Sequence, residues 1–281
     1  MSTRAEHTSR LGIVAGAGKF PLMVLEGARA AGCHVTVVGL RGLADPVLMS
    51  RADAFYWAGI ARIGRCVRVL KRERATDVIF AGSVNKRAMY GRFRLLRFLP
   101  DLTGLRIWLV RTPDKRNDTL LNAVADEFES RGMTVRDCVT YCQQDMAVEG
   151  VLTRTQPSAT RVRDAEFGWR IAKELGRLDI GQSVAVKDAD VIAVEAIEGT
   201  DGMIERAGDL CPQGGWVMIK VAKPDQDMRF DVPTVGPDTI SNLRRAGASM
   251  LVIEASRTLI VDSDRMLAAA DEAGIAVVGM L

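Results

Sequence analysis

Short apolar runs alternate with amphipathic stretches along the first half of the chain. Runs typical of buried strands cover residues 11–15, 34–39, 77–81 and 133–138. Helical spacing of apolar residues covers 19–31, 63–74 and 119–130. Strands that alternate with helices are typical of βαβ units. We therefore predict an α/β domain with a mainly parallel sheet over residues 1–140.

The periodicity fades into a polar stretch over residues 141–163 and then resumes. Strands are predicted at 183–186, 191–197, 216–221, 250–254 and 275–278, and helices at 165–178, 202–210, 238–246 and 264–273. The pairs Pro237-Asp238 and Asp262-Ser263 are helix-start signals. We interpret 141–163 as an inter-domain linker and 164–281 as a second α/β domain.

Composition narrows the class of protein. The chain has 281 residues, of which 48% are hydrophobic, as in ordinary folded proteins of two domains. Its apolar stretches are too short to cross a bilayer, and residues 1–7 lack the apolar core of a signal peptide, so we expect a cytosolic protein. The five cysteines include no CxxC pair, which predicts free, buried thiols.

Charge differs between the two halves. Residues 1–140 contain 23 Lys/Arg and 13 Asp/Glu, a balance of +10, whereas residues 141–281 contain 15 and 22, a balance of −7. One half would attract anions and the other could hold cations, although each domain could simply have its own surface charge. The bases form no nucleic-acid-binding motif, so we expect no nucleic-acid partner.

Two glycine-containing turns follow predicted strands. The first contains Gly16, Gly18 and Lys19, and the second contains Gly82 and Ser83. In an open parallel sheet both would lie at the carboxyl ends of the strands, where ligands gather. Glycine lets the backbone approach a ligand, and helix-start amides favour a phosphate, but glycine is equally common in such turns for packing alone. Neither turn is a complete dinucleotide or P-loop motif.

Histidine is scarce, and this constrains the chemistry. The two histidines, His7 and His34, have no sensible catalytic partner, which argues against a histidine-based triad, base or zinc site. A metal ion would have to be held by carboxylates, and that favours Mg²⁺ or Mn²⁺.

Acidic residues gather in two places in the second half. Glu195, Glu198 and Asp201 lie where a predicted strand turns into a helix. Residues 220–233 interleave three acids with three bases and end at Pro233. Divalent cations bind such oxygens and diphosphates bind Lys and Arg. The alternative is a solvated loop satisfied by its own ion pairs.

The segment Tyr90–Pro100 interleaves bases with large apolar residues. It could lie at a membrane interface, or pack its apolar face on its own domain.

Several strings resemble the UDP-2,3-diacylglucosamine pyrophosphatases of the LpxI type. They are IVAGAGKFP, AGSVNKR, DKRNDTLL, DIGQSVAVKDADVIAVEAIEGTDGMIERAG and KVAKPDQDMRFDVPTVGPDTI. The resemblance implies an enzyme of lipid A biosynthesis in Gram-negative bacteria, with a Rossmann-like N-terminal domain, a distinct α/β C-terminal domain and a divalent cation. It also implies a UDP-linked diacylglucosamine substrate and peripheral association with the cytoplasmic face of the inner membrane; a homodimer is left open.

The pattern of the family implies that Asp225 is the essential acid. As a hypothesis from the residues themselves, Asp225 with Asp227, Glu195, Glu198 or Asp201 would hold the metal, and Lys223 and Arg229 would be further catalytic residues. Lys220, Thr200 and the two glycine turns would bind substrate. Of the family's paired acids before TLL, only Asp118 is present, because Asn117 replaces the other.

The expected reaction is attack by water on the lipid-side phosphorus, giving UMP and 2,3-diacylglucosamine 1-phosphate (lipid X). Two alternatives stay open at the level of the sequence. One is a soluble nucleotide-sugar hydrolase or transferase with a non-lipid substrate, and the other is a non-catalytic nucleotide-binding module.

Overall fold

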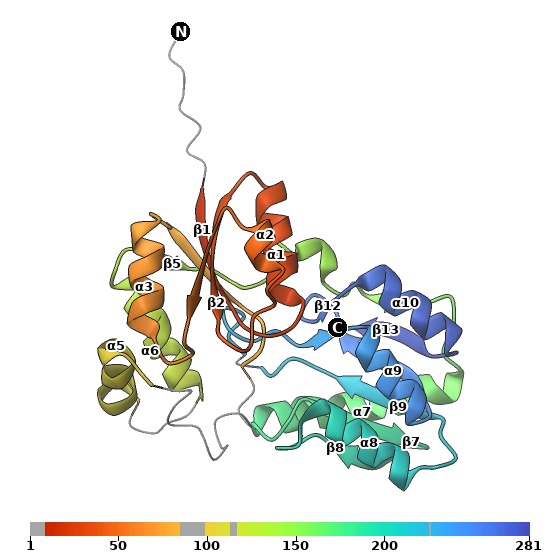
Figure 1. Ribbon diagram of the computed structural model, residues 1–281. Helices are drawn as coiled ribbons and strands as arrows, with labels where there is room; N and C mark the ends of the chain where they lie inside the picture. Colours follow the sequence, from red (N-terminus) through yellow and green to blue (C-terminus); the bar gives the residue numbers. More distant parts are fainter. Residues whose placement is uncertain (1–8, 85–98, 113–116, 225) are drawn as a thin grey trace. The chain divides into compact units, whose positions relative to one another are not determined.

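The computed structural model describes residues 9–84, 99–112, 117–224 and 226–281, which fold into two compact units (Figure 1). The first unit comprises the chain up to Cys142 together with Met228–Phe230. The second unit comprises Gln143–Asp227 and Asp231–Leu281. The expectation of two α/β domains is confirmed.

The first unit is built on a parallel five-stranded sheet in the order β3-β2-β1-β4-β5. The strands are β1 (Arg10–Ala15), β2 (His34–Leu40), β3 (Ala54–Ala58), β4 (Asp77–Ala81) and β5 (Thr134–Val135). The chain order reverses between β1 and β4, which is the topological switch point of a Rossmann-like sheet.

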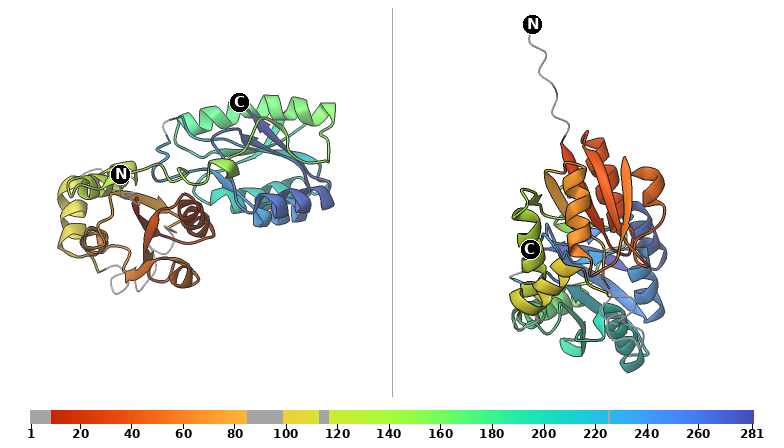
Figure 2. Two further views of the ribbon diagram at one scale, coloured as in Figure 1. Left: turned by 90° about the horizontal axis from the view of Figure 1, so that it is seen from above. Right: turned by 60° about the vertical axis from the view of Figure 1, so that its left-hand side comes forward.

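Helices cover both faces of this sheet (Figure 2). They are α1 (Phe20–Ala30), α2 (Leu48–Arg51), α3 (Ile63–Arg72), α5 (Leu102–Arg106), the π-helical turn η2 (Ile107–Arg111) and α6 (Asn117–Glu129). Successive side chains of a strand point to opposite faces of the sheet, which explains this arrangement. On one face, Val14, Val38 and Val78 pack in one core with Leu70 of α3 and Phe128 of α6.

The second unit is built on a mixed six-stranded sheet in the order β6-β13-β11-β9-β7-β8. Strands β13, β11 and β9 are parallel, and the three outer pairings are antiparallel. The strands are β6 (Gly150–Val151), β7 (Ser183–Lys187), β8 (Asp190–Val194), β9 (Trp216–Lys220), β11 (Ala248–Glu254) and β13 (Ala276–Met280). A separate parallel pair joins β10 (Thr234–Val235) to β12 (Leu259–Ile260).

One long helix lies on one face of the second sheet and three helices lie on the other (Figure 2). The single helix is α7 (Ala159–Arg177), and the other three are α8 (Gly199–Leu210), α9 (Pro237–Arg245) and α10 (Ser263–Glu272). Each layer has its own buried apolar cluster, so the sheet is covered by core on both sides. Within the described residues, no helix has the length and apolar character needed to span a membrane.

The polar stretch 141–163 differs from a free linker. A 3₁₀ turn, η3 (Gln143–Asp145), is followed by β6, which pairs antiparallel with β13 at the edge of the second sheet. The Thr155 amide and hydroxyl both donate to Asp271, at 2.9 and 3.0 Å. These contacts attach residues 150–155 to the second unit.

Two other expectations from the sequence can be compared with the structure. All five cysteines are free and buried, as predicted. The interleaved segment Tyr90–Pro100 lies mostly outside the described residues, which resume at Leu99.

Candidate functional site

The two glycine turns of the first unit meet at the switch point between β1 and β4. The Ala17 amide donates to the Ser83 carbonyl at 2.9 Å, and the Ser83 amide donates back to Ala17 at 3.0 Å. A Cβ on Gly16 would lie 2.7 Å from the Ser83 oxygen, and one on Gly82 would lie 2.6 Å from the Ala17 oxygen. The expectation that both turns lie at the carboxyl ends of the strands is confirmed. Gly16 and Gly82 are needed because two backbones approach each other there.

Gly18 differs from Gly16 and Gly82, because the position that a side chain would occupy there is open space. Its φ is +94°, and a Cβ built there meets no heavy atom within 4 Å. Lys19 follows as the residue that precedes α1. Gly18 thus combines a left-handed backbone conformation with open space beside it, at the topological switch point of the sheet. A ligand could approach the backbone at such a position. Contact of Gly18 or Lys19 with substrate stays a prediction.

A pocket of about 520 Å³ lies in the first unit, with Asp77, Arg136 and Tyr141 in its lining. Asp77 is the first residue of β4, so this pocket lies at the amino end of that strand. Its charges are paired, since Arg136 Nε lies 2.6 Å from Asp77 Oδ1. Ligands of open parallel sheets gather at the opposite end, so this pocket is a weak candidate for the site.

A second pocket, of about 380 Å³, lies in the second unit and holds four of the predicted site residues. We call it the Lys220 pocket. Its lining residues are Glu198, Gly199, Thr200, Asp201, Lys220, Thr234, Asp238 and Thr239.

Local structure places the Lys220 pocket at the ends of three elements. Lys220 is the last residue of β9, and the pocket also contains the first turns of α8 and α9. Gly199 adopts φ +80° and turns the chain into α8, while Gly236 precedes α9. Helix N-termini carry unpaired amides and a partial positive charge, and a lysine adds a full charge. These groups favour an anion such as a phosphate, and they act against three carboxylates in the same lining, those of Glu198, Asp201 and Asp238.

Lys220 and Glu195 are both buried, with 7% and 8% of their surface exposed. Lys220 Nζ donates to the Thr234 carbonyl at 3.0 Å and to the Thr200 hydroxyl at 3.4 Å. That hydroxyl donates to Glu195 Oε1 at 3.0 Å. Burial lowers the pKa of Lys220, and the negative charge of Glu195 opposes this shift.

The second carboxylate oxygen of Glu195, Oε2, is buried and has no hydrogen-bond partner among the described residues. An unpaired carboxylate oxygen is costly in the interior. The polar chain from Lys220 through Thr200 to Glu195 is therefore incomplete at its Glu195 end.

The other predicted metal ligands have partners of their own. Glu198 forms an ion pair with Arg206, and its pKa is lowered first by a backbone hydrogen bond and further by that arginine. Asp201 accepts from Asn242 Nδ2 at 2.8 Å. Across the described ranges, no group of three or more His, Cys, Asp or Glu residues could hold a metal ion. The described carboxylates therefore do not fit a metal centre, and Asp225 lies outside the described residues.

The loop after β9 divides the predicted catalytic residues between the two units. Lys223 forms an ion pair with Asp179 in the second unit, to which Asp227 also belongs. Arg229 belongs to the first unit, where its Nη2 donates to Asn122 at 2.8 Å and its guanidinium lies 5.1 Å from the Phe230 ring centre. Within the second unit the structure brings Glu195, Thr200 and Lys220 together, and the roles of Lys223 and Arg229 stay predictions.

Sequence reasoning missed four residues of the Lys220 pocket, namely Gly199, Thr234, Asp238 and Thr239. The helix-start signal at Pro237-Asp238 was visible. The signal gave the start of α9, but only the pairing of β10 with β12 and the packing of α9 bring that start beside Lys220.

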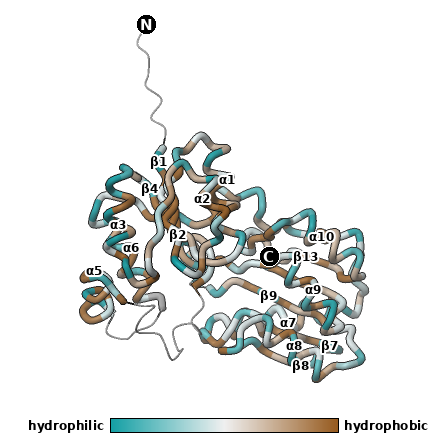
Figure 3. The backbone as a smooth tube through the Cα atoms, in the orientation of Figure 1, coloured by the Kyte–Doolittle hydropathy of each residue, from teal (hydrophilic) through white to brown (hydrophobic). Residues whose placement is uncertain are grey.

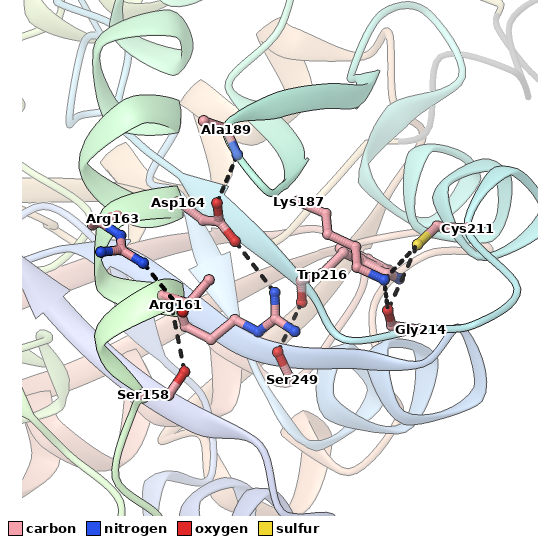
Figure 4. Close-up of polar contacts among 11 residues, drawn as sticks. Ser158, Arg161, Arg163, Asp164, Lys187, Ala189, Cys211, Gly214, Trp216 and Ser249 are labelled. Atoms are coloured by element: carbon pink, nitrogen blue, oxygen red, sulfur yellow. Dashed lines mark hydrogen bonds and ion pairs between the residues drawn. The ribbon is translucent and has the colours of Figure 1, made fainter.

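A separate polar cluster surrounds Asp164 of α7 (Figure 4). Asp164 is 1% exposed; its Oδ1 accepts from the Ala189 amide at 2.8 Å, and its Oδ2 lies 3.2 Å from Arg161 Nη1. Asp188 and Ala189 have φ of 55° and 59°, which is strained for residues other than glycine. The cluster supports the β7–β8 turn, and its buried carboxylate is fully paired, so we assign it a structural role.

Two family models together match most of the chain. One, described as the LpxI N-terminal domain, matches residues 10–144, and the other, the LpxI C-terminal domain, matches residues 148–278. The UDP-2,3-diacylglucosamine pyrophosphatase LpxI of Caulobacter vibrioides is 35% identical over 280 residues, covering 96% of this chain and 97% of that protein.

The solved structure of the biotin carboxylase domain of the Hydrogenobacter thermophilus 2-oxoglutarate carboxylase aligns with 72% of this chain and 41% of its own chain, at 15% identity and a TM-score of 0.27. A likeness at this level carries no argument about fold or function.

Proposed function

The chain belongs to the LpxI family, and from this we propose that it hydrolyses the diphosphate of UDP-2,3-diacylglucosamine in lipid A biosynthesis. The products would be UMP and 2,3-diacylglucosamine 1-phosphate. The observation that supports this chemistry best is the Lys220 pocket, where a buried lysine lies beside the first turns of two helices.

The Lys220 pocket suits a diphosphate for a simple electrostatic reason. Hydrolysis of an anhydride increases negative charge on the phosphoryl oxygens, and fixed positive groups stabilise that charge without reorganising. Lys220 is fixed by burial and by its contacts with Thr200 and Thr234. In this proposal Lys220 neutralises the diphosphate, and the Thr239 hydroxyl, which accepts from the Gly236 amide and keeps its own proton, donates to a diphosphate oxygen.

We propose different roles for the two units in the reaction. The first unit, with its excess of bases and the open side of Gly18, would bind the nucleotide. The second unit would carry the chemistry, with Asp225 as the essential acid. Lys223 and Arg229 are proposed to assist, although both side chains have protein partners in this structure.

A requirement for Mg²⁺ or Mn²⁺ is part of the proposal through the family resemblance. Such a metal would neutralise the diphosphate and activate water. Because the described carboxylates do not form a metal centre, we derive no step through the metal. We also propose a site of action at the cytoplasmic face of the inner membrane, since the substrate carries two acyl chains.

A direct assay tests the proposed function. We expect the purified protein to hydrolyse UDP-2,3-diacylglucosamine, to leave UDP-N-acetylglucosamine nearly untouched, and to lose activity in EDTA until Mg²⁺ or Mn²⁺ is restored. Equal turnover of both substrates would replace the lipid substrate with a soluble nucleotide sugar. Full activity after chelation would remove the metal from the proposal.

The position of attack can be read from the products. Hydrolysis in H₂¹⁸O should place the label in the lipid phosphate if water attacks the lipid-side phosphorus. Label in UMP would show attack at the other phosphorus.

A further inference from the structure

Large apolar side chains are exposed on one short stretch of the first unit, residues 99–110. Six of the seventeen exposed large hydrophobic residues in the described ranges lie there: Leu99, Leu102, Leu105, Trp108, Leu109 and Val110. Leu102 is 87% exposed, Val110 72% and Leu109 66%. Single exposed leucines need no explanation, but a contiguous group of them usually marks an interaction surface. We call this surface the α5–η2 apolar face; the backbone near α5 has brown, hydrophobic stretches between paler and teal ones in Figure 3.

The α5–η2 apolar face is on a firmly anchored element. Asp101, which precedes α5, accepts from the Gly104 amide at 2.9 Å. The same carboxylate accepts from the Gly64 and Arg65 amides at 3.2 and 2.9 Å, so it caps the starts of α5 and α3 together. A Cβ on Gly104 would lie 2.2 Å from the Ala61 carbonyl oxygen, which shows how closely α5 lies against the turn before α3. The apolar side chains are therefore exposed on a fixed support.

The arrangement of these residues is amphipathic. Leu102, Leu105 and Leu109 have the spacing i, i+3 and i+7, which places them on one side of a helical stretch. Ile107, on the other side, is 2% exposed and packs in the core of the first unit. One side of the element is thus already covered, and the remaining side presents leucines together with Trp108.

Two arginines lie beside the α5–η2 apolar face. Arg106 is exposed among the leucines, and Arg68 of α3 is 71% exposed and lies 4.0 Å from Asp101. Residues 1–140 as a whole carry the balance of +10. Apolar side chains beside flexible bases match a bilayer with anionic headgroups, because the apolar groups enter the acyl boundary while the bases meet the phosphates. Tryptophan is favoured at that boundary.

We propose that the α5–η2 apolar face docks the protein on the surface of an anionic lipid bilayer. This extends the proposed function, in which the substrate is itself a membrane lipid. Docking and hydrolysis can be measured separately, so that failure of one does not imply failure of the other.

The test is flotation of the full chain with vesicles, without substrate. Vesicles of phosphatidylcholine with half phosphatidylglycerol are compared with vesicles of phosphatidylcholine alone. The test variant is Leu102→Ser/Leu109→Ser/Val110→Ser. The matched control is Leu178→Ser/Leu210→Ser/Val148→Ser, three residues of the same types and similar exposure in the second unit.

We expect wild type and control to float with the anionic vesicles, and the test variant to bind at least about tenfold more weakly. Binding should fall on phosphatidylcholine alone and in high salt. Equal flotation of test variant and wild type would overturn the proposal, as would a wild type that binds neither vesicle. A wild-type dimer that dissociates in the test variant while vesicle binding persists would assign the surface to a second copy and also overturn it. Hydrolysis of detergent-dispersed substrate by the test variant checks that the proposed activity survives independently.

Discussion

Lys220 and Glu195, two buried residues of opposite charge, are joined through a single hydroxyl group, that of Thr200. The lysine donates to the hydroxyl and the hydroxyl donates to the carboxylate. A buried ion pair that is bridged in this way depends on the bridging group, since without it both charges lose a hydrogen bond in the interior.

Thr200→Val removes the bridge while keeping the shape of the side chain. We expect the free energy of unfolding to fall by about 1–3 kcal/mol, because Glu195 and Lys220 each lose a partner. Urea unfolding measures this. Thr234→Val is the control: it loses one hydroxyl bond, to the Val232 carbonyl, but keeps the contact of Lys220 with the Thr234 carbonyl, so its loss should be smaller. A loss in Thr200→Val no larger than that in Thr234→Val would argue against the bridge.

Lys220→Met tests the proposed role of the lysine in the reaction. Turnover per folded molecule should fall about 10²–10³-fold if the charge stabilises the phosphoryl oxygens. The melting temperature should fall as well, because Glu195 stays buried without the opposite charge of Lys220. Lys187→Met, which loses the 2.8 Å bond to the Gly214 carbonyl, should lower stability and leave turnover per folded molecule intact. A fully active Lys220→Met variant would exclude the role.

The pH dependence of the activity should also reflect the lowered pKa of Lys220. The protonated lysine is the form proposed to be active, and burial moves its pKa below the ordinary 10.5. Activity should therefore decline on the alkaline side at a pH below 10.5. In Lys220→Arg the decline should move to higher pH, since arginine keeps its proton. A pH–rate profile of both proteins gives the comparison.

Gly18→Ala separates ligand approach from backbone strain. The new Cβ meets no protein atom, but φ of +94° costs about 1–2 kcal/mol for a residue other than glycine. Gly32→Ala in the same unit has the same kind of strain, at φ +80° with open space. We expect similar losses of stability in both, and a raised KM only in Gly18→Ala. Equal KM values would remove Gly18 from the substrate site.

Asp225→Ala should abolish hydrolysis without unfolding the protein or preventing substrate binding. The expectation rests on the family resemblance and on the position of Asp225 in the acidic loop after β9. Turnover and equilibrium binding of the substrate, measured on the same folded sample, test the two parts. Near-normal turnover in a folded variant would show that Asp225 is dispensable.

Most helices and strands could be predicted from the sequence, because the spacing of their apolar residues and the length of the segment indicated the same kind of element. Strand β3 was missed because its five residues, AFYWA, are mostly half-buried and show no alternation. The π-helical turn η2 was missed because its apolar residues are exposed, which no pattern of burial predicts. The antiparallel partners of the second sheet also escaped prediction, since the sequence does not indicate strand order.

The site was predicted less completely than the fold. Glu195, Thr200 and Lys220 were singled out as polar residues near the ends of strands, and the structure joins them. Glu198 and Asp201 were predicted to be metal ligands, and that role stays a prediction; in the structure their carboxylates contact Arg206 and Asn242. A cluster of acids in a sequence shows which groups are close along the chain. It does not show which other side chains those acids contact.

The short segment Met228–Phe230 makes the boundary between the units in space different from any single boundary in the sequence. The Phe230 ring lies 5.5 Å from that of Phe80, and the Cys138 amide donates to the Met228 carbonyl at 3.0 Å. A protein cut between Cys142 and Gln143 would yield an N-terminal half with an uncovered aromatic surface and a C-terminal half carrying the three residues that cover it. The two halves are therefore complementary fragments, and a gene fusion or domain exchange in this family would have to carry this tripeptide along with the N-terminal unit.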